Sequence, residues 1–295
     1  MKKITEKLEV QVRRDYKDTI FRKLFSRKEE LLSLYNAVRG SEYTNIEELE
    51  IVTLDNAVYM NVRNDVAFLI DYSLNLYEHQ STYNPNMPLR NLFYVSKEFS
   101  KLVDGDTLYR SSLVRIPAPR FIVFYNGTEN QPSRKYMRLS EAFEGALEEP
   151  ELELVVTVLN INPGKNEELL KQCQVLKEYV QYTTKVREYV KDYSLQEAVE
   201  KAVQESIEEG ILKEFLSQNR KEAIEVSIFE YNEERVLQDI RQDEFRMGKE
   251  EGIKQGEERI MLLCNKLIAE NRTEDLKYAM ENKEYRKKLC EEYHI

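Results

Sequence analysis

The chain has 295 residues, of which 41% are hydrophobic and 33% are charged, and its formal net charge at pH 7 is −10. This length allows one large domain or two smaller ones with a substantial core, and the composition is that of a soluble globular protein. No apolar run approaches the roughly 20 residues that a membrane helix needs. The charged N-terminus also lacks the apolar core of a secretory signal, so we expect neither a membrane partner nor secretion.

The cysteines and histidines give no metal or disulfide signature. The three cysteines, Cys173, Cys264 and Cys290, are odd in number and widely spaced, which fits neither a disulfide framework nor a zinc site. The two histidines are too few for a His-rich metal site. Reduced thiols predict a cytoplasmic location.

The negative charge is unevenly distributed along the chain. Residues 1–165 hold 22 Lys and Arg against 24 Asp and Glu, whereas residues 166–295 hold 22 against 30. A basic window at 13–28 would favour phosphate binding, with a strong dependence on salt. A solvated helix flank is the alternative interpretation. The cations in the window are Arg13, Arg14, Lys17, Arg22, Lys23, Arg27 and Lys28.

The first predicted element is a helix over 15–39. Its apolar residues recur at helical spacing, with a break near Ser26, and Gly40 is a plausible C-cap. Asp18 borders the buried face of this helix. It could point into a site formed with the following strands, or it could be a first-turn acid that interacts with the helix dipole.

The segments up to residue 165 mix strands with helices. A short strand is expected at 51–54 and a hairpin with strands at 59–70 and 74–81. Pro88 then fits the first turn of a helix that runs to about residue 103. Apolar runs at 120–125 and 152–159 are typical of strands covered on both faces. The mixture predicts an α/β fold, with helices on the faces of a mixed sheet.

After Lys165 the sequence predicts helices and no further strand. Helical periodicity extends over 166–245, and we expect a flexible or weakly helical connector where Gly248, Gly252 and Gly256 recur four residues apart. Short amphipathic helices over 260–295 could dock on a partner chain, and together these features favour a homodimer. The predicted regions are 1–165, a helical extension at 166–245, and a glycine-spaced tail with terminal helices at 246–295.

The predicted hairpin gathers polar side chains on one face. If it turns at 72–73, Asp65 lies opposite Gln80 and Ala67 lies opposite Glu78, so that Asp65, Glu78 and Gln80 point the same way. A slip of one residue would send the two polar sets to opposite faces. Mg²⁺ binds clusters of this kind through one or two carboxylates plus water. A solvated polar strand end is the alternative.

Several segments of the chain resemble the recombination-promoting nuclease, or putative transposase, branch of the PD-(D/E)XK nuclease superfamily. EHQS followed by NPNMPLR is the most specific of them, and GKEEGIKQGEER resembles the tails of that family. The likeness covers roughly residues 13–165. The other segments that carry it are KDTIFRKLF (17–25), NDVAFLID (64–71) and PRFIVFYNG (119–127).

The resemblance implies a restriction-endonuclease-like α/β core in residues 1–165 that cuts DNA with a divalent metal, Mg²⁺ or Mn²⁺. Asp65 then corresponds to the motif's aspartate and Glu78 to its glutamate, and these two residues hold the metal. Asp18 matches an acid that some members place on the first helix. Gln80 stands where the wider superfamily has lysine, and an amide supplies a dipole but no positive charge.

Two main functions follow from these observations. The first is a metal-dependent DNA endonuclease that promotes recombination or transposition. Its predicted catalytic residues are Asp65, Glu78, Gln80 and Asp18, and its predicted DNA contacts are Arg13, Arg14, Lys17, Arg22, Lys23 and Arg90. Arg90, in the first turn of the helix after the hairpin, could equally be a surface arginine. The second function is a nuclease-fold module with weak or lost catalysis that binds DNA or assembles through its helical tail. A purely structural helical oligomer is a third, weaker possibility.

Overall fold

The structure is a computed structural model, and it describes residues 19–52, 65–145 and 148–295. The chain divides into two compact units, Met1–Glu234 and Arg235–Ile295. Among the described residues, no helix combines the length and the hydropathy that crossing a bilayer requires.

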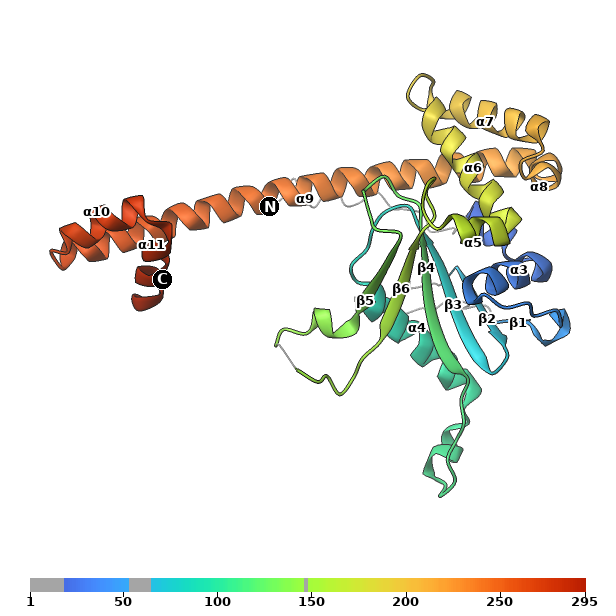
Figure 1. Ribbon diagram of the computed structural model, residues 1–295, viewed down its shortest axis with the longest axis horizontal. Coiled ribbons are helices and arrows are strands. Elements are labelled where there is room, and N and C mark those ends of the chain that lie inside the picture. Colours follow the sequence, from blue (N-terminus) through green and yellow to red (C-terminus); the bar gives the residue numbers. More distant parts are fainter. Residues whose placement is uncertain (1–18, 53–64, 146–147) are drawn as a thin grey trace. The chain divides into compact units, whose positions relative to one another are not determined.

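A mixed sheet forms the centre of the first unit (Figure 1). The strand order is β1-β2-β3-β4-β6-β5, with β3, β4 and β6 parallel and the remaining neighbours antiparallel. Helix α4 (Met87–Leu102) connects β3 to β4, the crossover that a parallel pair requires. The predicted α/β class with a mixed sheet is therefore confirmed. The strands are β1 (Glu50–Ile51), β2 (Val66–Ile70), β3 (Ser73–Gln80), β4 (Ala118–Tyr125), β5 (Arg134–Arg138) and β6 (Val155–Asn160).

Each face of the sheet has its own apolar core. Helix α4 lies behind the sheet in Figure 1 and packs on the face that carries Leu76 and Val123. Helices from both ends of the unit pack on the opposite face, where Tyr77 and Phe124 are fully buried. Because side chains alternate along a strand, neighbouring residues of β3 serve different cores.

The hairpin turns one residue earlier than predicted. Asp71 and Tyr72 have φ values of 47° and 53°, and Ile70 pairs with Ser73. Positive φ at both central residues is the signature of a type I′ turn, which matches the twist of the flanking strands. The predicted pairs were therefore wrong by two residues. A shift of two keeps each side chain of the paired strands on its face, so Glu78 and Gln80 share a face of β3 as expected, whereas Asp65 precedes the first residue of β2.

The N-terminal helical segment is interrupted where the sequence predicted. Helix α2 (Ile20–Leu24) is capped by the Thr19 side chain, which accepts a hydrogen bond from the backbone N of Arg22 at 3.1 Å. Helix α3 (Lys28–Arg39) ends at Gly40, whose φ of 64° is the left-handed conformation typical of a helix C-cap. The predicted first turn at Pro88 is likewise confirmed.

The helices after residue 165 share the core of the sheet. Leu170, Tyr182, Val199 and Leu216 are buried in the same cluster as Phe124 of β4. The compact unit consequently extends to Glu234, whereas the regions defined by sequence divide at 165 and 245. The helices are α5 (Glu167–Gln172), α6 (Gln174–Tyr189), α7 (Leu195–Glu209), α8 (Lys213–Gln218) and α9 (Arg220–Ala269), and the 3-10 turns are η1 (Ile46–Glu48), η2 (Gly105–Tyr109) and η3 (Leu139–Ala142).

Two elements differ from the sequence expectation. Strand β5 was not predicted, because its sequence RKYMR carries three cations and lacks an apolar run. Helix α9 continues through Gly248 and Gly252 without a break, where we expected a flexible or weakly helical connector. Glycine costs roughly 1 kcal/mol in a helix interior, a cost that good helix formers on either side can offset.

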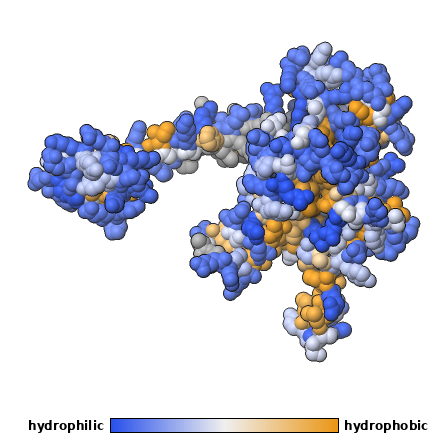
Figure 2. All heavy atoms as spheres, in the orientation of Figure 1, coloured by the Kyte–Doolittle hydropathy of each residue, from blue (hydrophilic) through white to orange (hydrophobic). Residues whose placement is uncertain are grey.

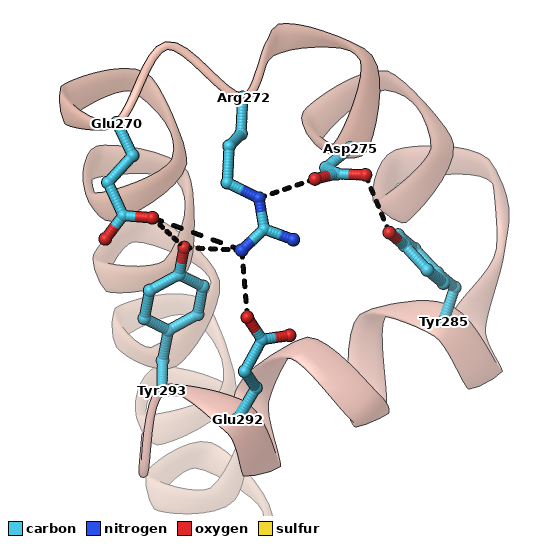
Figure 3. A network of polar contacts seen from close by, with 6 residues as sticks. All are labelled: Glu270, Arg272, Asp275, Tyr285, Glu292 and Tyr293. Carbon is cyan, nitrogen blue, oxygen red and sulfur yellow. Dashed lines mark hydrogen bonds and ion pairs between the residues drawn. The ribbon is translucent and has the colours of Figure 1, made fainter.

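The second unit packs two short helices, α10 (Thr273–Glu281) and α11 (Lys283–Glu292), on the last turns of α9. The expected terminal amphipathic helices are thus present. Leu267 and Leu289 are buried between them. A polar network around Arg272 joins the three helices, as Figure 3 shows.

Candidate functional site

The two predicted metal ligands lie next to each other at the end of the hairpin. Asp65 immediately precedes β2, and its Oδ2 accepts a hydrogen bond from the backbone N of His79 at 2.8 Å. Glu78 belongs to β3, and its side chain points to the face covered by α4. The negative charge of Asp65 is one of the influences that raise the pKa of Glu78, so the two carboxyl groups interact electrostatically.

Glu78 is a buried acid that is only partly compensated. It is 5% exposed, and its Oε1 accepts a charged contact from Arg90 Nη2 at 2.7 Å. Its second oxygen, Oε2, is buried and has no hydrogen-bond partner among the described residues. Burial raises the pKa of Glu78 to about 8, although the nearby Arg90 guanidinium opposes this shift. A buried carboxylate with a free oxygen is costly unless a cation or donor reaches it.

Gln80 lies on the same face, one pleat further along β3. It is 9% exposed, and its amide nitrogen donates to Met87 Sδ at 2.7 Å. Thioether sulfur is a weak acceptor, so this contact holds the amide loosely. The nearby Gln80 amide also acts to lower the pKa of the Glu78 carboxyl.

Helix α4 places Arg90 over the acids. Its Nη2 also donates to the hydroxyl of Tyr94 at 2.9 Å, and its guanidinium lies 5.9 Å from the centre of the Tyr94 ring. Arg90 is therefore held between α4 and β3. The sequence allowed Arg90 to be either a phosphate contact or simply a surface arginine. The description as a surface arginine is incomplete, because Arg90 forms an ion pair with the buried Glu78.

The donor set has the chemistry that a hard divalent cation requires. Asp65 and Glu78 provide carboxylate oxygens, and Glu78 Oε2 is available for a further contact. Within the described residues, no group of three or more His, Cys, Asp or Glu side chains could hold a metal. Two carboxylates are at most the small protein donor set with which Mg²⁺, retaining several waters, can be bound.

The other predicted site residues are only partly placed. Arg13, Arg14, Lys17 and Asp18 lie outside the described residues. Arg22 and Lys23 belong to α2, whose Phe21 stacks on the ring of His79 and therefore lies on the face opposite Glu78. Lys23 forms an ion pair with Glu222 at 2.8 Å. The structure thus gathers Asp65, Glu78, Gln80 and Arg90, and it places Arg22 and Lys23 on the opposite face of the sheet.

Lys135 is a cation near the site that sequence reasoning missed. Across the sheet, Glu78 pairs with Val123, Val123 with Val158, and Val158 with Lys135. Lys135 therefore lies in the same row and on the same face as Glu78. Its Nζ donates to Tyr83 Oη at 2.7 Å and lies 4.4 Å from the centre of that ring. The signal was hidden because β5 itself was not predicted.

Comparison of the chain with protein-family models, with curated proteins and with solved structures finds no match. Its function is therefore argued from the site.

Proposed function

We propose that this protein is a metal-dependent DNA endonuclease with a restriction-endonuclease-like, PD-(D/E)XK core, acting in recombination or transposition. It hydrolyses phosphodiester bonds with Mg²⁺ or Mn²⁺ held by Asp65 and Glu78. One observation carries the proposal: Glu78 is buried beside another acid, yet one of its oxygens has no hydrogen-bond partner. The mixed sheet with helices on both faces and the EHQS–MPLR segment support the nuclease assignment.

The side chains around the acids have distinct roles in this proposal. A bound divalent ion supplies a water of lowered pKa and neutralises charge on the scissile phosphate. The Gln80 amide orients the attacking water. Arg90 provides the positive charge that Gln80 lacks, since a guanidinium can pair with a phosphate oxygen as it does with Glu78. DNA is therefore expected to approach from the end of the hairpin where α4 begins.

A second candidate function is a module of the same fold with weak or no catalysis, which binds DNA or assembles through its helical tail. The contact that favours it is the Arg90–Glu78 ion pair, because a cation already occupies one oxygen of the acid. If that pair replaces the metal, Glu78 is structural. Metal binding therefore separates the two candidates.

Supercoiled plasmid nicking in Mg²⁺ or Mn²⁺ tests the first candidate. We expect nicking by the wild type and its loss in Asp65→Ala. Glu98→Gln is the matched control, because Glu98 is also a buried glutamate paired with a cation, Lys101 at 2.8 Å, but it lies on α4. Equal nicking by wild type and Asp65→Ala would remove the assignment of the site.

Calorimetric titration with Mn²⁺ tests the same site without DNA. The endonuclease predicts saturable binding that Asp65→Ala abolishes and Glu98→Gln preserves. No binding by the wild type, together with no nicking, would favour the second candidate.

We also propose that the protein is a homodimer associated through α9. A side chain added at Gly248, Gly252 or Gly256 would meet nothing within 4 Å, so a second helix can approach these positions closely. Light scattering on the full chain should give twice the chain mass. Gly252→Leu should lower that mass to a monomer's, and a wild type that is monomeric at all concentrations would contradict the proposal.

A further inference from the structure

A cavity of about 690 Å³ opens where strands β4 and β6 separate. Their pairing begins at Ile122 and Thr157, and the preceding residues of the two strands diverge. Ligand pockets typically measure about 300–1,000 Å³, so the volume suits a small molecule. Figure 2 shows hydrophobic side chains gathered over this part of the sheet, surrounded by hydrophilic ones.

Three arginines from separate elements line the cavity. Arg39 ends α3, Arg120 belongs to β4, and Arg134 begins β5. None of them forms an ion pair with a carboxylate in the part of the chain that the structure describes. The lining carboxylate is Glu153, which already accepts hydrogen bonds from Ser140. The cavity therefore has an excess of positive charge, and guanidinium groups pair well with phosphate.

Two buried polar residues adjoin the cavity. Asn75 is 0% exposed and Tyr77 is 1% exposed, and both line the cavity. Asn75 Oδ1 and the Tyr77 hydroxyl have no hydrogen-bond partner among the described residues. Burial without a partner costs roughly 1–3 kcal/mol for such a group, but both atoms lie beneath the surface of the cavity, so they are not counted among its ligand contacts.

The register of the sheet brings these polar groups together. Asn75 pairs with Arg120, and Tyr77 pairs with Ile122, so all four side chains project to one face. The Arg39 and Arg120 charges also act on the Tyr77 hydroxyl, where they oppose the upward shift of its pKa that burial causes. Arg120 therefore lies on the same side of the sheet as Tyr77.

The remainder of the cavity is apolar and aromatic. Leu92, Val95, Phe121 and Leu154 line it from the face of the sheet that α4 covers, and Tyr136, which is 54% exposed, belongs to β5. A ligand for this cavity needs an anionic group for the arginines and a flat or apolar part for these side chains.

We propose that the cavity binds a nucleoside phosphate. The phosphate contacts Arg39, Arg120 and Arg134, and the base lies against the apolar lining. None of Asp65, Glu78, Gln80 and Arg90 lines the cavity, although Leu92 and Val95 belong to α4, on the face of the sheet that carries Glu78. The proposal therefore does not depend on nuclease activity.

Calorimetric titration of the full-length protein tests this proposal. The probes are the four nucleoside 5′-monophosphates, the four matching nucleosides, inorganic phosphate and a single-stranded oligonucleotide. We expect at least one monophosphate to bind saturably, and to bind at least about tenfold more tightly than its nucleoside and than inorganic phosphate.

Two charge reversals locate the site. Arg120→Glu should lower the affinity for the monophosphate at least about tenfold, whereas Arg115→Glu, an equal charge change at an exposed arginine outside the cavity, should leave it unchanged. Arg134→Glu provides an independent second variant, and circular dichroism checks that each variant folds.

Several results would overturn the proposal. These are the absence of saturable binding by every monophosphate, equal losses in Arg120→Glu and Arg115→Glu, and inorganic phosphate binding as tightly as the nucleotides. Binding of the oligonucleotide alone would instead indicate a nucleic-acid surface. A protein that nicks DNA normally but fails these titrations would lose this proposal and keep the first one.

Discussion

The polar groups around Glu78 and those around Arg272 represent two different ways of accommodating charge. Arg272 is partly exposed and fully engaged, with Nε on Asp275 at 2.5 Å and Nη1 on Glu292 at 2.9 Å, while Tyr285 donates to the other oxygen of Asp275 (Figure 3). Glu78 is buried, and only one of its two oxygens has a partner.

The difference separates a structural network from a candidate site. The Arg272 contacts join α9, α10 and α11 and hold the pKa of Asp275 below its usual range, mainly through the Tyr285 hydrogen bond. The surroundings of Glu78 raise its pKa, so the fold disfavours the ionised form of this carboxyl unless a cation or a hydrogen-bond donor is bound. A group that a fold buries and leaves partly unpaired is a candidate for binding or chemistry. The following predictions test this contrast, from the largest expected effect to the smallest.

Glu78→Gln should reduce Mg²⁺-dependent nicking on the order of 100-fold, because it removes a metal ligand and the charge that orients the site.

Glu78→Gln should also remove the loss of stability that the metal-free wild type shows as pH rises. The wild-type pKa is raised from 4.5 to about 8, so the folded state loses stability between these values, and glutamine does not ionise. Denaturant unfolding at pH 5 and pH 8 measures the second effect.

Arg272→Gln is the matched comparison for that experiment. It should leave nicking unchanged, since its contacts lie within the second unit. Loss of nicking in Arg272→Gln, or full nicking in Glu78→Gln, would contradict the assignment of Arg272 to a structural network and of Glu78 to the functional site.

Gln80→Lys should raise the nicking rate about tenfold, because an ammonium group supplies a positive charge where the amide supplies only a dipole. Gln80→Met, which keeps the length but removes all polarity, should lower the rate. Initial rates under identical metal concentrations compare the three proteins. If lysine and methionine behave alike, position 80 does not take part in the reaction.

His79 tests whether a half-buried group on the other face of β3 has a structural role. Its ring stacks on Phe21 at 5.2 Å, and Nε2 lies 3.1 Å from the Tyr179 hydroxyl. Burial, with a contribution from Arg187, lowers the pKa of His79 from 6.5 to about 3. The contribution of neutral His79 to the free energy of unfolding is therefore fully present above pH 6.5 and is lost as pH falls toward 3. Between pH 7 and pH 5 this loss is up to about 2 kcal/mol.

Urea unfolding of His79→Gln at these two pH values should show a smaller acid-induced loss than the wild type. His294→Gln, which changes the other histidine, should keep the wild-type pH dependence. An identical pH dependence in all three proteins would show that His79 does not set it.

The smallest effect is expected from the Arg272 network itself. Arg272→Gln should accelerate amide hydrogen exchange in α10 and α11 by a few-fold, because one residue contacts several helices. Lys277→Gln is the control, since its 3.0 Å pair with Glu274 is an exposed contact within one helix. Mass spectrometry of exchanged peptides from residues 260–295 measures both, and equal exchange would assign the network no stabilising role.

The sequence predicted elements where local chemistry decides the structure. Gly40 ends α3 and Pro88 begins α4, as propensity requires, and the apolar run at 120–125 lies within β4. The common face of Glu78 and Gln80 followed from the two-residue period of a strand. Contacts between distant elements were not predictable. The Arg90–Glu78 ion pair joins a helix to a strand, and the cavity depends on where β4 and β6 diverge.

The errors also have physical causes. Strand β5 is an edge strand rich in cations. This composition protects sheet edges, but it gives no apolar pattern from which the strand could be predicted. The hairpin register was misjudged because Asp71 and Tyr72 occupy a turn in which Asn-Gly is the usual signal. The continuity of α9 was missed because its glycines were given more weight than the helix formers between them.

The short connection at Asp71 and Tyr72 determines which of the two cores each side chain of the hairpin enters. Sliding one strand by a single position would drive the Glu78 carboxyl among the rings of Phe21 and Phe124 and expel His79 from them. Two residues held in a backbone conformation that L-amino acids seldom adopt thus assign the side chains of both strands either to the layer under α4 or to the layer on the opposite face.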